Sequence, residues 1–167
     1  CLSYWLIGLG SWYNLICQKD QMKKKSIEIT VPVYNEEKEL EQNITTLYEF
    51  CEKNLKPYDW NITIADNASK DNTPVISSTL AKKYSKIKYF RLEQKGRGRA
   101  VKRAWSQSKC DYCIYMDLDL STDLVHLPNI LKKLEKGYDI AIGSRLAKGA
   151  KVEGRTFLRE LTSKALN

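Results

Sequence analysis

The segment "CDYCIYMDLDLSTD", residues 110–123, joins an apolar, aromatic-rich run to a turn that carries three aspartates. Residues 110–117 predict a buried strand, because a short apolar run that ends in turn residues is typical of a parallel sheet. Asp117, Asp119 and Asp123 lie within seven positions, where their charges repel one another. Either a positive partner such as a divalent metal offsets this repulsion, or the strand simply runs into an aspartate-rich turn and a helix cap.

On both sides of this strand the chain alternates short β-rich runs with longer helical ones. We expect other strands at residues 26–34, 60–66, 86–92 and 138–144, and helices at residues 36–55, 71–84, 98–108, 124–137 and 155–166. This alternation predicts an α/β fold, with a mostly parallel sheet and helices on both of its faces.

In open parallel sheets, ligands bind at the carboxyl ends of the strands. Four polar, charged or glycine-rich loops are expected there: "VPVYNEE" (31–37), "ADNASKD" (65–71), "KGRGR" (95–99) and "DLDLSTD" (117–123). Because the strands should end at one edge, we expect the loops to line one crevice. Taken singly, each loop also suits an ordinary strand-to-helix turn.

The acidic turn predicts a metal site. Asp117 and Asp119, separated by Leu118, can share a hard cation with phosphate oxygens, and both magnesium and manganese accept that arrangement. Such a cation would neutralise the charge that builds on a leaving diphosphate, which is electrostatic rather than acid–base catalysis. Asp123 equally suits the N-cap of the helix that follows.

The other three loops offer groups for a nucleotide. Lys95 and Arg97 flank Gly96 near a helix start, a favourable place for phosphate, although the loop is neither a GxGxxG nor a P-loop motif. Tyr34 offers a flat stacking surface, and Glu36 and Asp66 offer hydrogen-bond acceptors for a base and ribose. The alternative for the basic loop is a flexible, solvated turn.

The amino-terminal residues 1–17 carry no charge and precede the lysine-rich stretch "QKDQMKKK". A bilayer span takes about 20 apolar residues, but Trp and Tyr followed by lysines are typical of the cytoplasmic end of a transmembrane helix. We therefore expect residues 1–22 to attach the chain to a membrane and residues 23–167 to form an α/β domain that faces the cytoplasm. An interfacial helix or a core segment are the alternatives.

The start without methionine inside an apolar run, and the end without a helix-stop signal, predict a piece of a longer protein. Lysine and arginine exceed aspartate and glutamate by 28 to 20, a charge of +8 that suits an anionic membrane or a phosphorylated substrate. Nucleic acid is not expected as a partner, because the chain has no RNA-binding aromatic motif and no zinc finger. Five irregularly spaced cysteines do not suggest a disulfide framework.

With the four loops in order, the chain resembles a GT-A fold glycosyltransferase of the inverting family 2. The matching pieces are "VPVYNEE", "ADNASKDNT", "KGRGRA", "YMDLDLSTD" and "IGSR". Residues 142–167, "IGSRLAKGAKVEGRTFLRELTSKALN", are similar to the polyprenol-phosphate sugar transferases, the dolichyl-phosphate mannose and glucose synthases. The chain departs from the family at Asn67 and Ala68, where a DDGS-type loop is common, but Asp66 stays in place.

The resemblance implies the following contacts. The nucleotide sugar would meet Pro32, Tyr34, Glu36, Ile64, Asp66, Lys95, Arg97, Asp117, Leu118, Asp119 and Ser121. The metal, Mg²⁺ or Mn²⁺, would be held by Asp117 and Asp119, with Asp119 as its direct ligand. Ser121 matches a position where mannose synthases often have glutamine, and serine is too short for us to expect ligation. The acceptor phosphate would be bound by Arg145, Arg159 and Ser163, and Asp117, Asp119 and Arg145 would be catalytic.

The implied reaction moves a hexose from UDP-glucose or GDP-mannose to polyprenyl or dolichyl phosphate. Because a lipid phosphate is already ionised near neutral pH, its oxygen needs no general base. Two arginines and a metal would instead screen the repulsion between two anions and fix the line of attack. Two alternatives stay open: a transferase acting on a saccharide or protein hydroxyl, with a carboxylate base beyond Asn167, and a non-catalytic nucleotide- or membrane-binding module.

Overall fold

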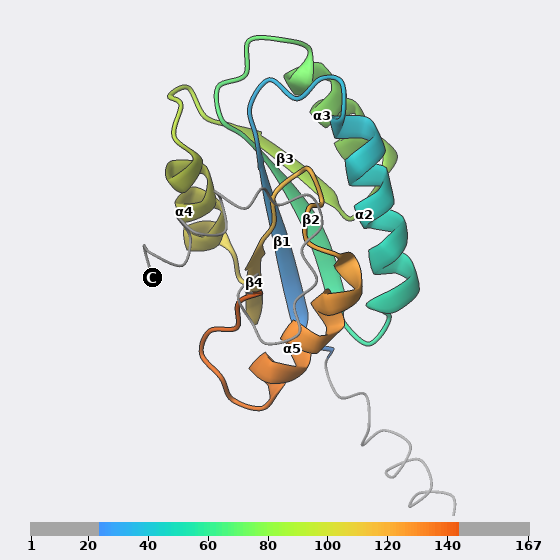
Figure 1. Cartoon of the computed structure of the whole chain (residues 1–167). Coiled ribbons are helices and arrows are strands. Elements are labelled where there is room, and N and C mark those ends of the chain that lie inside the picture. Colours follow the sequence, from blue (N-terminus) through green and yellow to red (C-terminus); the bar gives the residue numbers. More distant parts are fainter. Residues whose placement is uncertain (1–23, 144–167) are drawn as a thin grey trace, which may run out of the picture. The chain divides into compact units, whose positions relative to one another are not determined.

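The computed structural model describes residues 24–143 (Figure 1). Its elements in chain order are β1 (Ser26–Val33), α2 (Leu40–Asn54), β2 (Asp59–Asp66), α3 (Thr73–Lys83), β3 (Ile87–Arg91), α4 (Arg97–Gln107), β4 (Tyr112–Tyr115), a 3-10 turn (Leu124–His126) and α5 (Leu127–Glu135). The chain divides into two compact units, the first ending at Leu124 and the second beginning at Val125.

Within residues 24–143, four strands form one sheet in the order β3-β2-β1-β4, and every neighbouring pair is parallel. The central strand β1 pairs with β2 from Ser26 opposite Asp59 to Val33 opposite Asp66. Its residues from Ile27 to Val31 are all buried, as expected for a strand covered on both faces. The predicted α/β class and the parallel sheet are confirmed.

Helices α2 and α3 cover one face of the sheet. The stripe of α2 that is buried has helical spacing and consists of Leu40, Ile44, Leu47 and Cys51. Next to this stripe, the Tyr48 ring meets the Trp60 ring of β2 edge-on at 5.3 Å between centroids, and the Tyr84 ring at the end of α3 at 4.4 Å. These contacts place both helices over the Trp60 side of β2.

Helix α4 covers the opposite face, as Figure 1 also shows. Its buried residues, Ala100 and Ala104, are small and lie one turn apart, which lets the helix approach the sheet closely. The Arg103 guanidinium lies over the Phe90 ring of β3 at 5.6 Å. Phe90 points away from the Trp60 face, because it pairs in register with Ala65 and side chains alternate along a strand.

The second unit differs from the predicted pattern in two ways. The single helix expected at residues 124–137 is a 3-10 turn followed by α5. Pro128 lies in the first turn of α5, and Gly137, just after the helix, has φ +90°. The fifth strand expected at 138–144 does not form over residues 138–143, where Ile140 and Ile142 are 79% and 80% exposed. An alternating apolar pattern becomes a strand only where its backbone groups find a partner ladder, and none pairs with this stretch in the described part of the chain.

Several predicted features lie outside the described residues. These are the membrane-attachment segment at 1–22, the helix at 155–166, and Arg145, Arg159 and Ser163. None of the helices within residues 24–143 is both long enough and apolar enough to cross a bilayer.

Candidate functional site

The loops after β1, β2 and β4 each contain a non-glycine residue in the left-handed region of backbone space. Asn35 has φ +55°, Ala68 has φ +64° and Leu120 has φ +47°. Such conformations are uncommon for residues with a side chain and cluster at ligand sites, where the surroundings hold them in place. All three residues fall in loops that the sequence selected as candidates.

The loops after β1 and β2 are bound to each other by several hydrogen bonds. The Asn35 N–H donates to Ser69 Oγ at 3.0 Å, and the Lys70 N–H donates to Asn35 Oδ1 at 2.8 Å. The Glu36 N–H donates to Thr73 Oγ1 at 2.8 Å. The edge of the site that carries Tyr34 and Glu36 is therefore held in shape by protein contacts alone.

Asp66, at the end of β2, has a fully buried side chain whose two oxygens both meet protein groups. Its Oδ1 accepts the Ser69 N–H at 2.9 Å, while Oδ2 accepts the Tyr89 hydroxyl at 3.2 Å and lies 3.6 Å from Arg91 Nε. Burial and the neighbouring Asp66 charge raise the pKa of Tyr89 to about 12, so the phenol stays a donor. Asp66 thus positions the loop and Arg91.

The basic loop joins both of these loops. Lys95 Nζ lies 3.7 Å from the centre of the Tyr34 ring, and the Gly96 N–H donates to Asn67 Oδ1 at 2.5 Å. A cation over an aromatic face is favourable, and the contact holds the Tyr34 ring beside a positive charge. A flat ring and an ammonium group suit a base and a phosphate, respectively.

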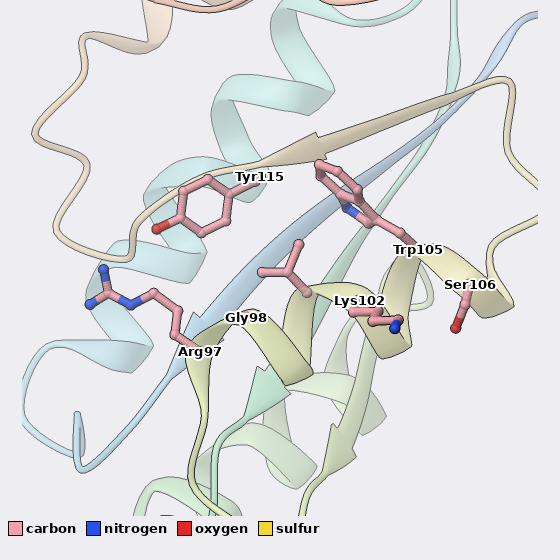
Figure 2. A pocket seen from close by; sticks show the side chains of 7 residues that line it. Arg97, Gly98, Lys102, Trp105, Ser106 and Tyr115 are labelled. Atoms are coloured by element: carbon pink, nitrogen blue, oxygen red, sulfur yellow. The ribbon is translucent and has the colours of Figure 1, made fainter.

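The acidic turn meets the basic loop at Asp117. Arg97 Nη1 lies 3.4 Å from Asp117 Oδ1, and the Tyr115 hydroxyl donates to the same oxygen at 2.6 Å. Burial and this hydrogen bond raise the pKa of Tyr115. Figure 2 shows Arg97 and Tyr115 with their polar ends turned the same way.

The rest of the acidic turn presents Asp119 near Glu36. Leu118 is buried while Asp117 and Asp119 on either side of it are exposed, so the leucine anchors the turn and the carboxylates point outward. Asp119 Oδ1 accepts the Ser121 N–H at 3.0 Å, which shapes the turn. Burial is the main cause that raises the pKa of Glu36; the charges on Glu39, Asp71 and then Asp119 add to it, while Arg97 opposes it.

All four loops are therefore brought together at the carboxyl edge of the sheet, as the sequence predicted. Two other predicted residues lie deeper, because Ile64 is fully buried in β2 and Pro32 is half-buried in β1. Two participants were missed: Arg91 and Tyr115. Arg91 pairs in register with Asp66, so the strand register is the signal that points to it. Tyr115, the last residue of β4, precedes Asp117 by two positions, so the two-residue period of a strand is the signal that points to it.

The carboxylates at the edge fit a divalent cation. Between residues 24 and 143, no three His, Cys, Asp or Glu side chains gather closely enough to hold a metal by themselves. Mg²⁺ and Mn²⁺ suit such a place, since they are commonly held by one or two carboxylates together with substrate phosphates. The guanidinium of Arg97 already stands beside Asp117, which indicates that this position attracts positive charge.

An open apolar pocket of about 730 Å³ lies beside this edge, between α4 and β4 (Figure 2). Its lining residues are Arg97, Gly98, Val101, Lys102, Trp105, Ser106 and Tyr115. Two of its aromatic side chains are partly exposed, Trp105 at 42% and Tyr115 at 39%. The pocket and the charged edge share Arg97 and Tyr115.

The chain is similar to dolichol-phosphate and dolichyl-phosphate sugar transferases. It is 33% identical to a dolichol-phosphate mannosyltransferase of Pyrococcus furiosus over 138 residues, which are 83% of this chain and 38% of that protein. It is 33% identical to a dolichyl-phosphate beta-glucosyltransferase of Dictyostelium discoideum over 161 residues, 89% of this chain and 49% of that protein. The chain thus spans less than half the length of each of these two relatives.

Among solved structures, a mannosyltransferase of Pyrobaculum calidifontis in complex with GDP-Man and Mn²⁺ shares the GT-A-like α/β fold. Its TM-score is 0.50 and its sequence identity 19%, over 66% of this chain and 34% of that one. Residues 28–164 match the family described as glycosyl transferase family 2. Since that match runs from β1 through all four loops at the carboxyl edge, the chain belongs to glycosyl transferase family 2.

Proposed function

We propose that this chain is the donor-binding part of an inverting, metal-dependent hexosyltransferase that acts on polyprenyl or dolichyl phosphate. The observation that carries the proposal is that carboxylates and cationic side chains meet at the carboxyl ends of the strands, where Arg97 forms an ion pair with Asp117. A nucleotide-diphosphate sugar needs both kinds of group, a hard cation held by carboxylates and positive side chains for its phosphates. Similarity to a dolichol-phosphate mannosyltransferase and a dolichyl-phosphate glucosyltransferase supports the lipid acceptor.

The donor would lie across the four loops. The Tyr34 ring would stack on the base, Glu36 would accept a hydrogen bond from the ribose, and Lys95 would sit beside a phosphate. Asp66 would act mainly by holding its loop and Arg91, given that protein donors engage both of its oxygens. Pro32, Ile64 and Leu118 would shape the floor of this site, and Ser121 would border the metal.

Asp117 and Asp119 would hold Mg²⁺ or Mn²⁺. When bound, the metal supplies positive charge that offsets the charge developing on the leaving diphosphate. The chain's own part is to fix the two carboxylates on the turn anchored by Leu118 and to keep Arg97 beside them. The Mn²⁺ and GDP-Man named with the Pyrobaculum protein support this assignment.

The acceptor phosphate would be bound by Arg145, Arg159 and Ser163. One of its oxygens would form a bond to the anomeric carbon as the bond from that carbon to the diphosphate breaks, on the opposite side. The diphosphate would leave with the electron pair, and no proton has to move because the lipid phosphate is already ionised. Holding two anions in line is then the main task of the arginines.

Membrane attachment is part of the same proposal. Residues 1–22 would attach the chain to a bilayer, and residues 23–167 would form the catalytic domain at its cytoplasmic face. The uncharged run at 1–17 and the lysines after it support this arrangement. The acceptor's head group would then be within reach of a domain held at the surface.

A transfer assay tests the proposal. Full-length protein in detergent receives polyprenyl phosphate, Mg²⁺ or Mn²⁺, and either radiolabelled UDP-glucose or GDP-mannose. We expect label in the lipid fraction from one donor only, and its loss on chelation of the metal. Label appearing instead on a saccharide or peptide hydroxyl would favour the other acceptor class, and donor binding without any transfer would favour a non-catalytic module.

A further inference from the structure

Arg97 touches a residue that the proposed function assigns to the metal. Its Nη1 lies 3.4 Å from Asp117 Oδ1, the same oxygen that accepts the Tyr115 hydroxyl at 2.6 Å. The pKa of Glu36 is raised, mainly by burial, and the positive charge of Arg97 opposes that rise. Arg97 therefore pairs with Asp117 and lies within electrostatic reach of Glu36.

The ion pair between Arg97 and Asp117 is suited to exchange. The two side chains are 70% and 47% exposed, and exposed pairs are weak because water and salt screen them. A divalent cation carries more charge on a smaller ion and binds the same carboxylate oxygens. A metal bound at Asp117 and the guanidinium of Arg97 would repel each other, so both cannot keep their closest positions.

Arg97 has room to move and another partner to meet. It is the first residue of α4, and its side chain is 70% exposed. The amino terminus of a helix and an arginine both favour phosphate groups. A diphosphate that arrives with the metal would therefore take up the guanidinium that the metal displaces.

We propose that Arg97 is an exchangeable counter-ion that occupies Asp117 in the free protein and passes to the donor's diphosphate when the metal binds. This inference rests on the proposed function, since it takes Asp117 as a metal ligand. Metal alone has to displace Arg97, so it binds weakly. A nucleoside diphosphate gives Arg97 a new partner, so metal and nucleotide strengthen each other's binding by the same factor.

The test is a titration of full-length protein in detergent with Mn²⁺, in which electron paramagnetic resonance reports the free ion. It is run with no nucleotide, with UDP and with GDP, on the wild type and on Arg97→Ala. Arg99→Ala is the matched control, because it removes an equal charge from the same helix, where Arg99 Nη1 bonds to Gln94 at 2.8 Å rather than to Asp117.

We expect Arg97→Ala to bind Mn²⁺ alone about twofold to fivefold more tightly than the wild type, the size of a weak surface ion pair. We also expect the nucleotide that binds to increase Mn²⁺ affinity less in Arg97→Ala than in the wild type. Arg99→Ala should show neither change. Together these results would support the exchange.

Mn²⁺ binding to Arg97→Ala that is equal to or weaker than wild type would overturn the inference, since Arg97 would then not compete with the metal. An equal gain in Arg99→Ala would also overturn it, as a general charge effect. In both cases Mn²⁺-dependent nucleotide binding by the wild type would leave the proposed function standing. If neither UDP nor GDP raises the wild type's Mn²⁺ affinity, the donor site itself fails and the inference fails with it.

Discussion

At the scale of single residues, Asp66 and Tyr34 have different tasks at neighbouring strand ends. Asp66 is fully buried, and protein groups contact both of its oxygens, so its replacement should mainly lower the stability of the fold. Tyr34 is half-buried and lies under Lys95, so its replacement should mainly lower the affinity for the ligand.

Asp66→Asn should lower the free energy of unfolding by about 1–3 kcal/mol. The amide NH₂ of asparagine would face a protein group that now donates a hydrogen bond to the carboxylate, and that bond would be lost. Urea denaturation measures this loss. Nucleotide affinity should fall little once the variant is measured under conditions where it is folded. Loss of nucleotide binding with unchanged stability would instead mean that Asp66 contacts the nucleoside directly.

Tyr34→Ala should weaken UDP or GDP binding in the presence of Mn²⁺ by roughly tenfold, since stacking of a base on an aromatic ring contributes about 1–3 kcal/mol. Calorimetric titration measures the affinity. Tyr34→Phe keeps the ring and is the matched control, with affinity expected near that of the wild type. Equal binding by the alanine variant would exclude Tyr34 as the base platform.

At the scale of elements, the start of β4 is fastened to the start of β1 by one carboxylate. Asp111 accepts the Ser26 N–H and hydroxyl, both at 2.8 Å, and Lys25 Nζ lies 3.1 Å from it. These hydrogen bonds from Ser26, followed by the one from Lys25, hold the pKa of Asp111 far below its usual range. The strand that ends in the acidic turn is thereby anchored at its opposite end.

The sign of the pH effect follows from this lowered pKa. The contact stabilises the fold above the unfolded pKa of about 4 and is lost as pH falls toward the lower folded pKa. Asp111→Asn should therefore lower the melting temperature at pH 7. The difference in melting temperature between this variant and the wild type should become smaller as the pH drops below about 4. A gap that stays constant with pH would contradict this account of the anchor.

The sequence predicted these elements well where the pattern was local. Alternating apolar runs placed β1 to β4, and the rule for carboxyl ends selected the loops that carry Asn35, Ala68 and Leu120. What it could not provide was pairing between strands. The contact of Asp66 with Arg91 needs the β2–β3 register, and residues 138–143 kept a strand pattern without finding a partner in the described part of the chain.

At the scale of the whole molecule, the site is made by four loops that are far apart in sequence and meet because parallel strands end at one edge. The family match confirms the resemblance seen in the motifs. The acceptor residues Arg145, Arg159 and Ser163 lie outside the described residues, so their part in the site stays a prediction. The proposed donor site can be tested without them.

The most direct test is calorimetric titration of the full-length protein with UDP and with GDP, with and without Mn²⁺. We expect one nucleotide to bind at least about tenfold more tightly with Mn²⁺, and Asp119→Asn to abolish that gain, because the turn would lose its direct metal ligand. Asp59→Asn, at the amino end of β2 and away from the acidic turn, should keep the gain in affinity. Nucleotide binding that ignores Mn²⁺, or a full Mn²⁺ gain in Asp119→Asn, would contradict the claim that the acidic turn binds the donor through a cation.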